Sequence, residues 1–414
     1  MFPPPCARAR AASSARSVAS AASRAYPRVA IVGGGVSGVS CAWRARTASD
    51  RAATVDVFDA GRALGGRACA RHGGGDARWD HGSRWTRDGT GGEGLGVEAW
   101  TEALEARDAT RTWRGTFGRV CASRGTFVRE EDVIRRVIAR TGGWDEALED
   151  ILGECGARAR TSARVVEVRR DARGGGLSVR WSDASKNGEE NVETGYDVVV
   201  FADKNIARAV GVMDGLDAED VAREMRAVDS APSLALMVTL NRAPMVPFVG
   251  ADVDNDSTLS WIANESSKSG RNASTNCWIA LSTERYAREK VTPETSATRP
   301  GSPEWAAWID QVADEMSASF IRLVRLAEAS SPTAAAPLEI TFARAHRWGA
   351  AFPLAVARGA RVNKFLRSAT SGALVYAIGD YCAEPVGTVE GAVASGLACA
   401  DDILARCFEA NSKL

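Results

Sequence analysis

The sequence carries no excess of charge and no long apolar run. Its 52 basic residues balance 52 acidic ones, so the formal net charge is zero and no overall field draws the chain to nucleic acid or to an anionic membrane surface. No stretch approaches the roughly 20 apolar residues that a membrane-spanning helix needs. We therefore expect no nucleic-acid partner and no transmembrane segment, while the oligomeric state stays open.

Metal-ligand patterns are also missing. The three histidines, His72, His81 and His346, stand apart from any cysteine pair. The nine cysteines show no CxxC spacing and are odd in number. Without a zinc pattern or a disulfide framework, the sequence predicts no metal site and reduced, buried thiols.

Acidic residues are absent from the start of the chain, where Asp50 is the first one. Residues 1–26 are rich in alanine, serine and arginine, a composition typical of an organelle transit peptide. The prolines at positions 3 to 5 argue against a helix at the extreme N-terminus, so we favour the chloroplast, with the mitochondrion as the alternative. A disordered bacterial-type extension is the other interpretation.

Glycine, in contrast, is concentrated in motifs near both ends of the chain. The first motif follows Val29–Val32, an apolar run typical of a buried parallel strand. Gly33 permits a tight turn, Gly35 lets backbone approach a pyrophosphate, and Gly38 lets the next helix pack close to the strand. The N-terminus of that helix offers unpaired N–H groups to phosphates.

Further features around this motif favour a dinucleotide. A second apolar strand ends in Asp59, 21 residues after Gly38, where an acid accepts hydrogen bonds from ribose hydroxyls. Gly65, Gly66 and Arg67 then provide another close backbone approach and a charge partner for phosphate. Plain dehydrogenases do not usually carry this pair, so it favours FAD over a nicotinamide. The predicted contacts at this end are Gly33, Gly35, Val36, Ser37, Gly38, Asp59, Gly65, Gly66 and Arg67.

The second motif occupies residues 374–404, LVYAIGDYCAEPVGTVEGAVASGLACADDIL. A protein that wraps an extended FAD needs such a segment to hold the ribityl chain and the flavin ring. If this segment does not contact the cofactor, a plain nicotinamide dehydrogenase is the alternative.

The expected fold class is α/β: an FAD-binding, Rossmann-like parallel sheet of the glutathione-reductase type with helices on both faces, and a discontinuous substrate domain of mixed sheet and helices. Strands predicted at 164–169, 177–181 and 196–202 form a hairpin that returns to the nucleotide sheet. The predicted FAD-binding domain is 27–84, 157–203 and 346–410, and the predicted substrate domain is 85–156 and 204–345.

Apolar spacing predicts the elements of the substrate domain. It indicates a helix through Val133–Ile138, ended by the TGG at 141–143, and a longer amphipathic helix through Trp305–Leu323. Apolar runs at 235–240 and 277–282 predict strands of an antiparallel sheet that also contains Ser257–Ile262.

Six segments in this order carry a family likeness. They are the first glycine motif, GGRACARH (65–72), WDHGSRW (79–85), LSWIANESSK (259–268), AHRWGAAFP (345–353) and GDYCAEPVGTVEGAVASG (379–396). Together they resemble the renalase-like branch of the flavin monoamine oxidase superfamily, especially its plant and algal members, over nearly all of residues 28–405.

The resemblance implies non-covalent FAD and oxidation of a small molecule at the flavin, with electrons passed to oxygen. Renalases are credited with oxidising isomeric forms of reduced nicotinamide dinucleotides, and earlier assignments in the family were as amine oxidases, so either NAD(P)H-type molecules or amines are candidate substrates. The resemblance implies that Val165 or Val166 pairs with adenine, and that Gly379 and Asp380 meet the ribityl chain. It places Gly82 near the flavin, and the helix N-terminus at Glu390, Gly391 and Ala392 against the flavin pyrimidine edge.

Two departures from the family pattern affect the substrate. Ala202-Asp203-Lys204 replaces a small residue followed by proline, and Ser83-Arg84-Trp85 replaces a glutamine–aromatic pair. The substrate pocket is therefore expected to differ from that of known renalases, and the resemblance does not identify the substrate.

For the substrate face the candidates are His81, Trp261, His346 and Trp348. A histidine orients a polar substrate or takes a proton near neutral pH, and tryptophans stack on a planar ring; structural or core roles are the alternatives for each. Some flavin amine oxidases place a lysine at flavin N5. Lys268 and Lys204 are the nearest candidates here, although exposed loop lysines are the more ordinary interpretation.

Other functions remain open. Carotenoid and protoporphyrinogen enzymes share both end motifs, so a flavin desaturase is one alternative, and it predicts a large apolar channel or membrane-binding face. A non-catalytic flavin-binding redox sensor is another, and it predicts a blocked or absent substrate cavity.

Overall fold

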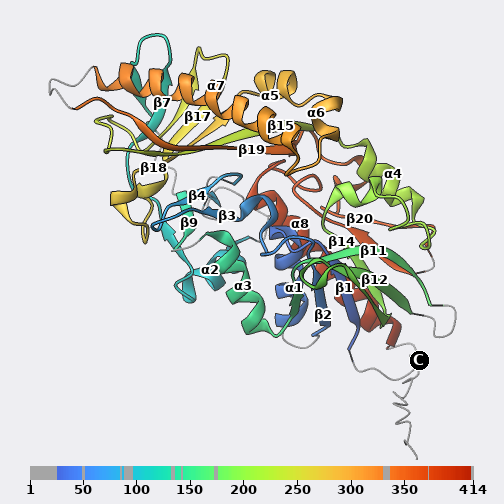
Figure 1. Cartoon of the computed structure of the whole chain (residues 1–414). Coiled ribbons are helices and arrows are strands. Elements are labelled where there is room, and N and C mark those ends of the chain that lie inside the picture. The colour runs from blue at the N-terminus through green and yellow to red at the C-terminus, as the bar shows by residue number, and fades with distance from the viewer. Residues whose placement is uncertain are drawn as a thin grey trace, which may run out of the picture.

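The computed structural model describes residues 26–48, 52–83, 86–87, 97–131, 136–140, 143–171, 176–329, 336–371 and 373–411. The predicted transit peptide lies outside these residues except for Tyr26. The molecule has two main sheets. In Figure 1 a parallel sheet with α1 and α8 lies below a second sheet that is covered by the long helix α7.

The parallel sheet has the strand order β10-β2-β1-β14-β21-β20. Neighbouring strands pair in parallel from β10 to β21, and β20 is antiparallel to β21. The apolar run predicted as a buried strand is β1, and Val29 to Ile31 are fully buried. The strands are β1 (Arg28–Val32), β2 (Thr54–Phe58), β10 (Arg158–Arg160), β14 (Val198–Phe201), β20 (Leu366–Arg367) and β21 (Leu374–Ala377).

Helices cover one face of this sheet. They are α1 (Val36–Thr47), α2 (Glu98–Ala106), α3 (Trp144–Cys155) and α8 (Val389–Asn411). Helices α1 and α8 approach closely, because a Cβ on Gly396 would lie 2.2 Å from Ser40 Oγ. The small residues of the C-terminal motif therefore let the two end motifs of the sequence pack together.

The other face differs from the expected layer of helices. It packs against a three-stranded antiparallel sheet of β11 (Ala163–Arg170), β12 (Leu177–Asp183) and β13 (Glu189–Tyr196), together with α4 (Glu219–Ala227). The strands predicted at 164–169 and 177–181 thus belong to a separate sheet. The strand predicted at 196–202 is β14 of the parallel sheet, and β13 leads directly into it. The polar stretch GEEN at 188–191, whose composition suggests a hairpin turn, instead begins this third strand, since β13 starts at Glu189.

The second main sheet has seven strands in the order β19-β15-β18-β17-β16-β7-β8. All neighbours are antiparallel except β16 and β7, which confirms the predicted antiparallel core of β15, β17 and β18. The strands are β7 (Phe117–Cys121), β8 (Phe127–Arg129), β15 (Ser230–Leu240), β16 (Gly250–Asp254), β17 (Leu259–Asn264), β18 (Cys277–Ser282) and β19 (Ile340–Pro353).

The predicted long amphipathic helix is confirmed as α7 (Pro303–Glu328), which packs its apolar stripe on this sheet. Ser302 caps it by accepting a hydrogen bond from the Trp305 N–H, and Pro303 occupies the first turn. The short helices α5 (Glu284–Lys290) and α6 (Pro293–Ala297) precede it.

The helix predicted through Val133–Ile138 is wrong. Residues 136–139 form the buried strand β9 (Arg136–Ala139), which lies between β5 (Thr86–Arg87) and β6 (Thr110–Thr112), while residues 132–135 lie outside the described residues. A short apolar run fits a buried strand and a buried helix equally well, and here pairing with two neighbouring strands decides.

Short elements complete the fold. They are the hairpin β3 (Ala70–His72) and β4 (Arg78–Asp80), and the 3-10 turns η2 (Gly66–Ala68), η4 (Ala184–Lys186), η5 (Lys204–Arg208), η6 (Glu265–Ser267), η7 (Ala273–Thr275) and η8 (Arg358–Ala360).

The proposed domain boundaries cross some of these elements. Strand β19 spans the boundary at 345/346, and α2 and α3 pack in the core of the parallel sheet, although 85–156 is assigned to the substrate domain. Among the described residues, no helix is long and apolar enough to cross a membrane. The eight cysteines in the described ranges are all free thiols, and Cys41, Cys277, Cys382 and Cys399 are buried.

Candidate functional site

A cavity of about 940 Å³ lies between the two main sheets. Its walls come from the carboxyl ends of β1 and β2, from β19 and from the first turn of α8. This is the edge at which parallel α/β sheets bind ligands, and the volume is near the upper end of the usual range for small-molecule sites.

The first glycine motif forms one wall of the cavity. Gly33 has φ +115°, a conformation that favours glycine, and it follows β1 directly. A Cβ on Gly38 would lie 2.0 Å from the Gly33 carbonyl oxygen, so Gly38 allows α1 to start against the strand. A Cβ on Gly35 would meet no atom within 4 Å, because this position faces the cavity.

The N-terminus of α1 suits an anion. Gly35 is its N-cap and provides no side-chain hydrogen bond, and the first turn holds no acidic residue. Val36 and Ser37 of that turn line the cavity. Uncapped N–H groups at a helix N-terminus bind phosphate, and the open space at Gly35 lets a ligand approach them.

Asp59 stands at the end of β2 and joins two loops of the cavity wall. Its carboxylate accepts hydrogen bonds from the N–H groups of Gly34 and Gly61, each at 2.6 Å. A carboxylate has further lone pairs, and Asp59 lines the cavity. The residue can therefore also accept from hydroxyl groups of a ligand.

Arg67 connects three segments that are distant in sequence. Its guanidinium donates two hydrogen bonds to the Asp380 carboxylate, at 2.6 and 2.8 Å, and another to the carbonyl of Ala351 on β19. The bidentate pair is a strong and directional contact. The Arg67 carbonyl in turn accepts from the N–H of Ser83 at 2.8 Å, and a Cβ on Gly82 would lie 2.1 Å from that oxygen.

His81, His346 and Trp348 form one aromatic cluster. The ring centroids of the histidines are 4.6 Å apart, and the Trp348 ring lies 5.0 Å from His81 and 4.4 Å from His346. The Trp348 indole N–H donates to the His81 carbonyl at 2.9 Å, and the Arg71 Nε lies 3.3 Å from His81 Nε2. His81 and Trp348 line the cavity.

Both histidines are neutral at pH 7. Burial, then the neighbouring His346 and Arg71, lower the pKa of His81 to about 2. Burial, followed by the positive charges of Arg71, Arg344 and Arg347, lowers the pKa of His346 to about 4. His346 is therefore uncharged at rest and a weaker base than an exposed histidine, and its role towards a substrate stays a prediction.

The C-terminal motif forms the remaining wall. Gly379 has φ +156°, and its N–H donates to Ser395 Oγ of α8 at 3.1 Å. Thr388 accepts a hydrogen bond from the Gly391 N–H through its Oγ1 at 3.0 Å, and a Cβ on Gly391 would lie 2.4 Å from the Pro385 carbonyl oxygen. Gly391 is therefore a close-packing position at the start of α8.

The cavity brings most of the predicted contacts together. The predicted residues that line it are Gly33, Gly35, Val36, Ser37, Asp59, Gly65, Gly66, Arg67, His81, Gly82, Val165, Trp348, Gly379, Asp380, Glu390 and Ala392. The predicted residues outside its lining are Gly38, Val166, Trp261, His346 and Gly391. His346 contacts the lining through His81 and Trp348, whereas Trp261 is 4% exposed in an apolar cluster with Trp79, Trp113 and Phe117.

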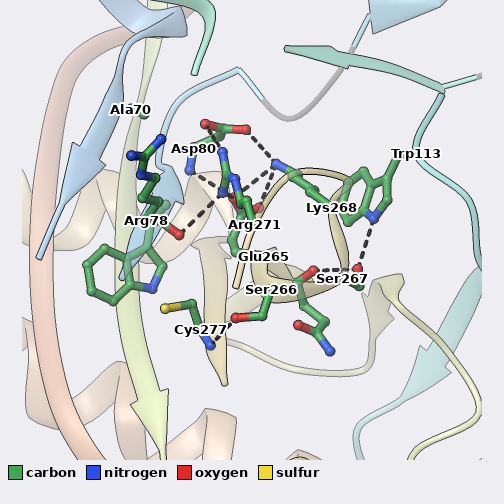
Figure 2. A network of polar contacts seen from close by, with 12 residues as sticks. Ala70, Arg78, Asp80, Trp113, Glu265, Ser266, Ser267, Lys268, Arg271 and Cys277 are labelled. Atoms are coloured by element: carbon green, nitrogen blue, oxygen red, sulfur yellow. Dashed lines mark hydrogen bonds and ion pairs between the residues drawn. The ribbon is translucent and has the colours of Figure 1, made fainter. Parts of the chain in front are cut away.

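The interpretation of Lys268 and Lys204 as exposed loop residues is wrong. Lys268 is buried and its Nζ lies 2.7 Å from Asp80 Oδ2 and 2.8 Å from Glu265 Oε1 (Figure 2). Lys204 is also buried, donates from Nζ to the Val228 carbonyl at 2.9 Å and is one of the residues that line the cavity. Burial lowers its pKa, with a further contribution from Arg208.

Sequence reasoning missed several lining residues. Ser233 of β15, Leu281 of β18 and the run Gly349–Pro353 of β19 belong to the cavity. Successive residues of a strand point to opposite faces of a sheet, but nothing local indicates which face of this sheet turns toward the parallel sheet. None of the cysteines that the structure describes is among the lining residues.

The fold and the cavity define a dinucleotide-binding protein, and comparison with known families identifies the family to which it belongs. Residues 31–93 match the model of an NAD(P)-binding Rossmann-like domain, and residues 90–404 match that of the flavin containing amine oxidoreductases. The second match covers more than half of the chain, so the chain belongs to the flavin-containing amine oxidoreductase family and is an FAD-dependent oxidoreductase. A search of curated proteins found no match.

Proposed function

We propose that this protein is a renalase-like oxidase whose preferred substrate is a reduced nicotinamide dinucleotide in an isomeric form, with amines as the second candidate class. Bound FAD would supply the redox chemistry, as the acceptor of a hydride from the substrate at flavin N5 and the donor of electrons to O2 with release of H2O2. The residues of this chain bind and orient both molecules.

The described residues fit a non-covalent FAD. The open position at Gly35 and the uncapped N-terminus of α1 would hold the pyrophosphate, and Asp59 would hold the ribose. Val165, which lines the cavity, would pair with adenine, and Asp380 would meet the ribityl chain. The first turn of α8, at Glu390 to Ala392, would lie against the flavin.

The observation that carries the substrate proposal is the charge around the aromatic cluster. His81 and His346 are neutral. The cations Arg71, Arg344 and Arg347 act on His346, and Arg71 also acts on His81, where the carboxylate of Asp80 opposes it. A positive potential of this kind repels a protonated amine and attracts the phosphates of a dinucleotide. The Trp348 ring supplies a flat surface for the reduced nicotinamide.

Anaerobic flavin reduction tests this proposal. Protein lacking residues 1–26 is saturated with FAD and mixed with simple amines, polyamines, reduced nicotinamide dinucleotides or their isomers, while the visible flavin bands are followed. We expect rapid bleaching by a reduced nicotinamide isomer and recovery in air with release of peroxide. Bleaching by amines alone would reject the dinucleotide and move the protein to the amine oxidases.

The charge argument gives a second test with the same assay. If phosphates are steered by Arg71 and its neighbours, the second-order rate constant for flavin reduction falls as salt is added, because screening weakens the attraction. A rate constant that does not change with salt would contradict the electrostatic part of the proposal. Flavin that no substrate reduces would favour the desaturase or the non-catalytic alternative.

We also propose a location for the protein in the cell. The composition of residues 1–26 supports import into the chloroplast, with the mitochondrion as the alternative. Fusion of these residues to a fluorescent protein, expressed in a green alga or a plant cell, distinguishes the two organelles.

A further inference from the structure

Four charged side chains form a buried network beside the cavity wall (Figure 2). Asp80 ends β4, Glu265 begins η6, Lys268 directly follows η6, and Arg271 comes three residues later. Lys268 Nζ bridges Asp80 and Glu265, at 2.7 and 2.8 Å, and Arg271 also contacts both acids, with Nη2 at 2.7 Å from Asp80 Oδ1. The Asp80 N–H donates to Glu265 Oε2 at 2.9 Å.

The network is neutral overall and almost fully buried. The four side chains are between 1% and 5% exposed, and their two positive charges offset two negative ones. The Trp113 ring covers Lys268, with Nζ 4.6 Å from the ring centroid. Desolvation on this scale makes a buried ion pair a poor source of stability compared with apolar residues of the same volume. What the network does provide is a fixed geometry, since each carboxylate is held by two cations.

That geometry is transmitted to the cavity by the residues that follow Asp80. His81 and Gly82 line the cavity, whereas the four charged residues do not. His81 is held on its other side by the Trp348 indole N–H, and Gly82 packs against the Arg67 carbonyl oxygen. The network therefore connects the seven-stranded sheet to a segment that contacts both the aromatic cluster and Arg67.

We propose that Asp80, Glu265, Lys268 and Arg271 are positioning residues that fix the His81–Gly82 wall of the cavity and thereby set the environment of the bound flavin. The nucleotide contacts at α1 and β2 lie on other segments, so this role is separable from FAD affinity. The proposal rests on FAD binding in the cavity and does not depend on the substrate.

A charge-balanced double variant separates positioning from stability. Lys268→Met leaves one excess negative charge and Glu265→Gln one excess positive charge, so each single variant is destabilised. The double variant Lys268→Met/Glu265→Gln is neutral again but lacks the lysine bridge to Asp80. We expect its thermal midpoint to recover towards that of the wild type and its FAD content to remain stoichiometric. Its visible circular dichroism, measured on the FAD-loaded protein without substrate, is expected to stay about twofold weaker.

A matched pair outside the cavity serves as control. Arg242 and Glu328 form a partly buried bidentate pair between the loop after β15 and the end of α7. The double variant Arg242→Met/Glu328→Gln is expected to lose stability and to keep the visible circular dichroism of the wild type. An identical signal from the wild type and the Lys268→Met/Glu265→Gln protein would overturn the positioning role.

Arg271→Lys is the second variant, for the case in which removal of Lys268 prevents folding. It keeps the charge but cannot reproduce the two-sided guanidinium contact with Asp80 and Glu265. We expect folded, FAD-loaded protein with an altered visible spectrum, and a wild-type spectrum would contradict the proposal. Because these readouts use no substrate, a protein that binds FAD but oxidises nothing would reject the proposed function and leave this test intact.

Discussion

At the scale of single residues, the charge state of His346 couples the site to pH. Its pKa is about 4 in the folded protein, against an ordinary value of 6.5. Between these values the unfolded chain binds a proton that the folded protein does not bind, so stability is present above pH 6.5 and is lost as the pH falls towards 4. A shift of this size corresponds to about 3 kcal/mol.

A His346→Gln variant checks this effect. As the pH falls from 7 to 4, the wild type is expected to lose about 3 kcal/mol of unfolding free energy relative to the variant. Urea denaturation at several pH values measures it, and the carboxylates that titrate in the same range cancel in the difference. A difference that is constant with pH would show that His346 titrates normally.

The glycines Gly35 and Gly38 are predicted to differ although they lie three residues apart. A Cβ on Gly38 would collide with the Gly33 carbonyl oxygen, whereas a Cβ on Gly35 would enter open cavity. We expect Gly38→Ala to destabilise the apoprotein by about 1–3 kcal/mol. Gly35→Ala should leave apoprotein stability nearly unchanged and weaken FAD binding by tenfold or more, that is by about 1.4 kcal/mol.

Thermal unfolding of both apoproteins and FAD titration followed by flavin fluorescence measure these effects. The two variants serve as controls for each other, because the methyl group of Gly38→Ala enters the packed interior and that of Gly35→Ala enters the open cavity. Normal FAD affinity in a stable Gly35→Ala protein would contradict the assignment of the pyrophosphate to this wall.

Residue roles could be predicted where the cause is local. The turn at Gly33 and the close packing at Gly38 follow from glycine spacing, and both are confirmed. The burial of Lys268 could not be predicted, because its partner Asp80 lies 188 positions away. The neutral state of His346 likewise depends on burial and then on Arg71, and only the fold provides either of them.

At the scale of elements, Asp56 ties several strands together. It lies on β2, is 2% exposed and contacts Arg28 of β1, Arg158 and Arg160 of β10, and the Tyr196 hydroxyl at the end of β13. Burial alone would raise the pKa of Asp56, but hydrogen bonds from Arg158 and Tyr196 and the nearby positive charges hold it well below its ordinary value. The carboxylate therefore contributes stability above its unfolded pKa, and this contribution is lost as the pH falls.

Asp56→Asn is expected to cost about 1–3 kcal/mol at neutral pH, because it weakens the charged hydrogen bonds to Arg28, Arg158 and Arg160 and leaves Glu193 as their remaining carboxylate partner. Denaturant unfolding measures this cost. The exposed helical pair Arg285–Glu289 provides the control, and Glu289→Gln should change stability by no more than about 0.5 kcal/mol. Equal effects of the two substitutions would mean that the Asp56 network does not hold the strands.

Elements with a strong period could be predicted, and short ones could not. The apolar stripe of α7 repeats over 26 residues and the prediction is confirmed. Strand β9 has four residues, and its apolar spacing also fits a helical turn. Its state depends on β5 and β6, whose positions no local pattern gives. The same holds for β13, whose polar residues suggest a turn and whose pairing with β12 makes it a strand.

At the scale of the whole molecule, each of the two sheets could be predicted by itself. Of the cavity between them, only the wall on the parallel sheet could be predicted. Glycine motifs indicate which edge of the parallel sheet lines the cavity, because glycine acts there through the backbone itself. The opposite wall comes from β15, β18 and β19, and which face of that sheet turns inward is decided by α7 covering the other face.

Because the cavity has walls from both sheets, bound FAD should couple their unfolding. Ligand at about 100 times its Kd stabilises the protein by about 2.7 kcal/mol.

Arg67 is central to this coupling, since it donates hydrogen bonds to Ala351 of the seven-stranded sheet and to Asp380 after β21. We expect Arg67→Met to lose most of the stabilisation by FAD and to broaden or split the calorimetric transition of the FAD-treated protein. Arg44→Met, which removes an exposed ion pair with Asp401, serves as control. It should keep the stabilisation by FAD and the single sharp transition of the wild type. A single sharp transition with full FAD stabilisation in Arg67→Met would show that the two sheets are coupled without this residue.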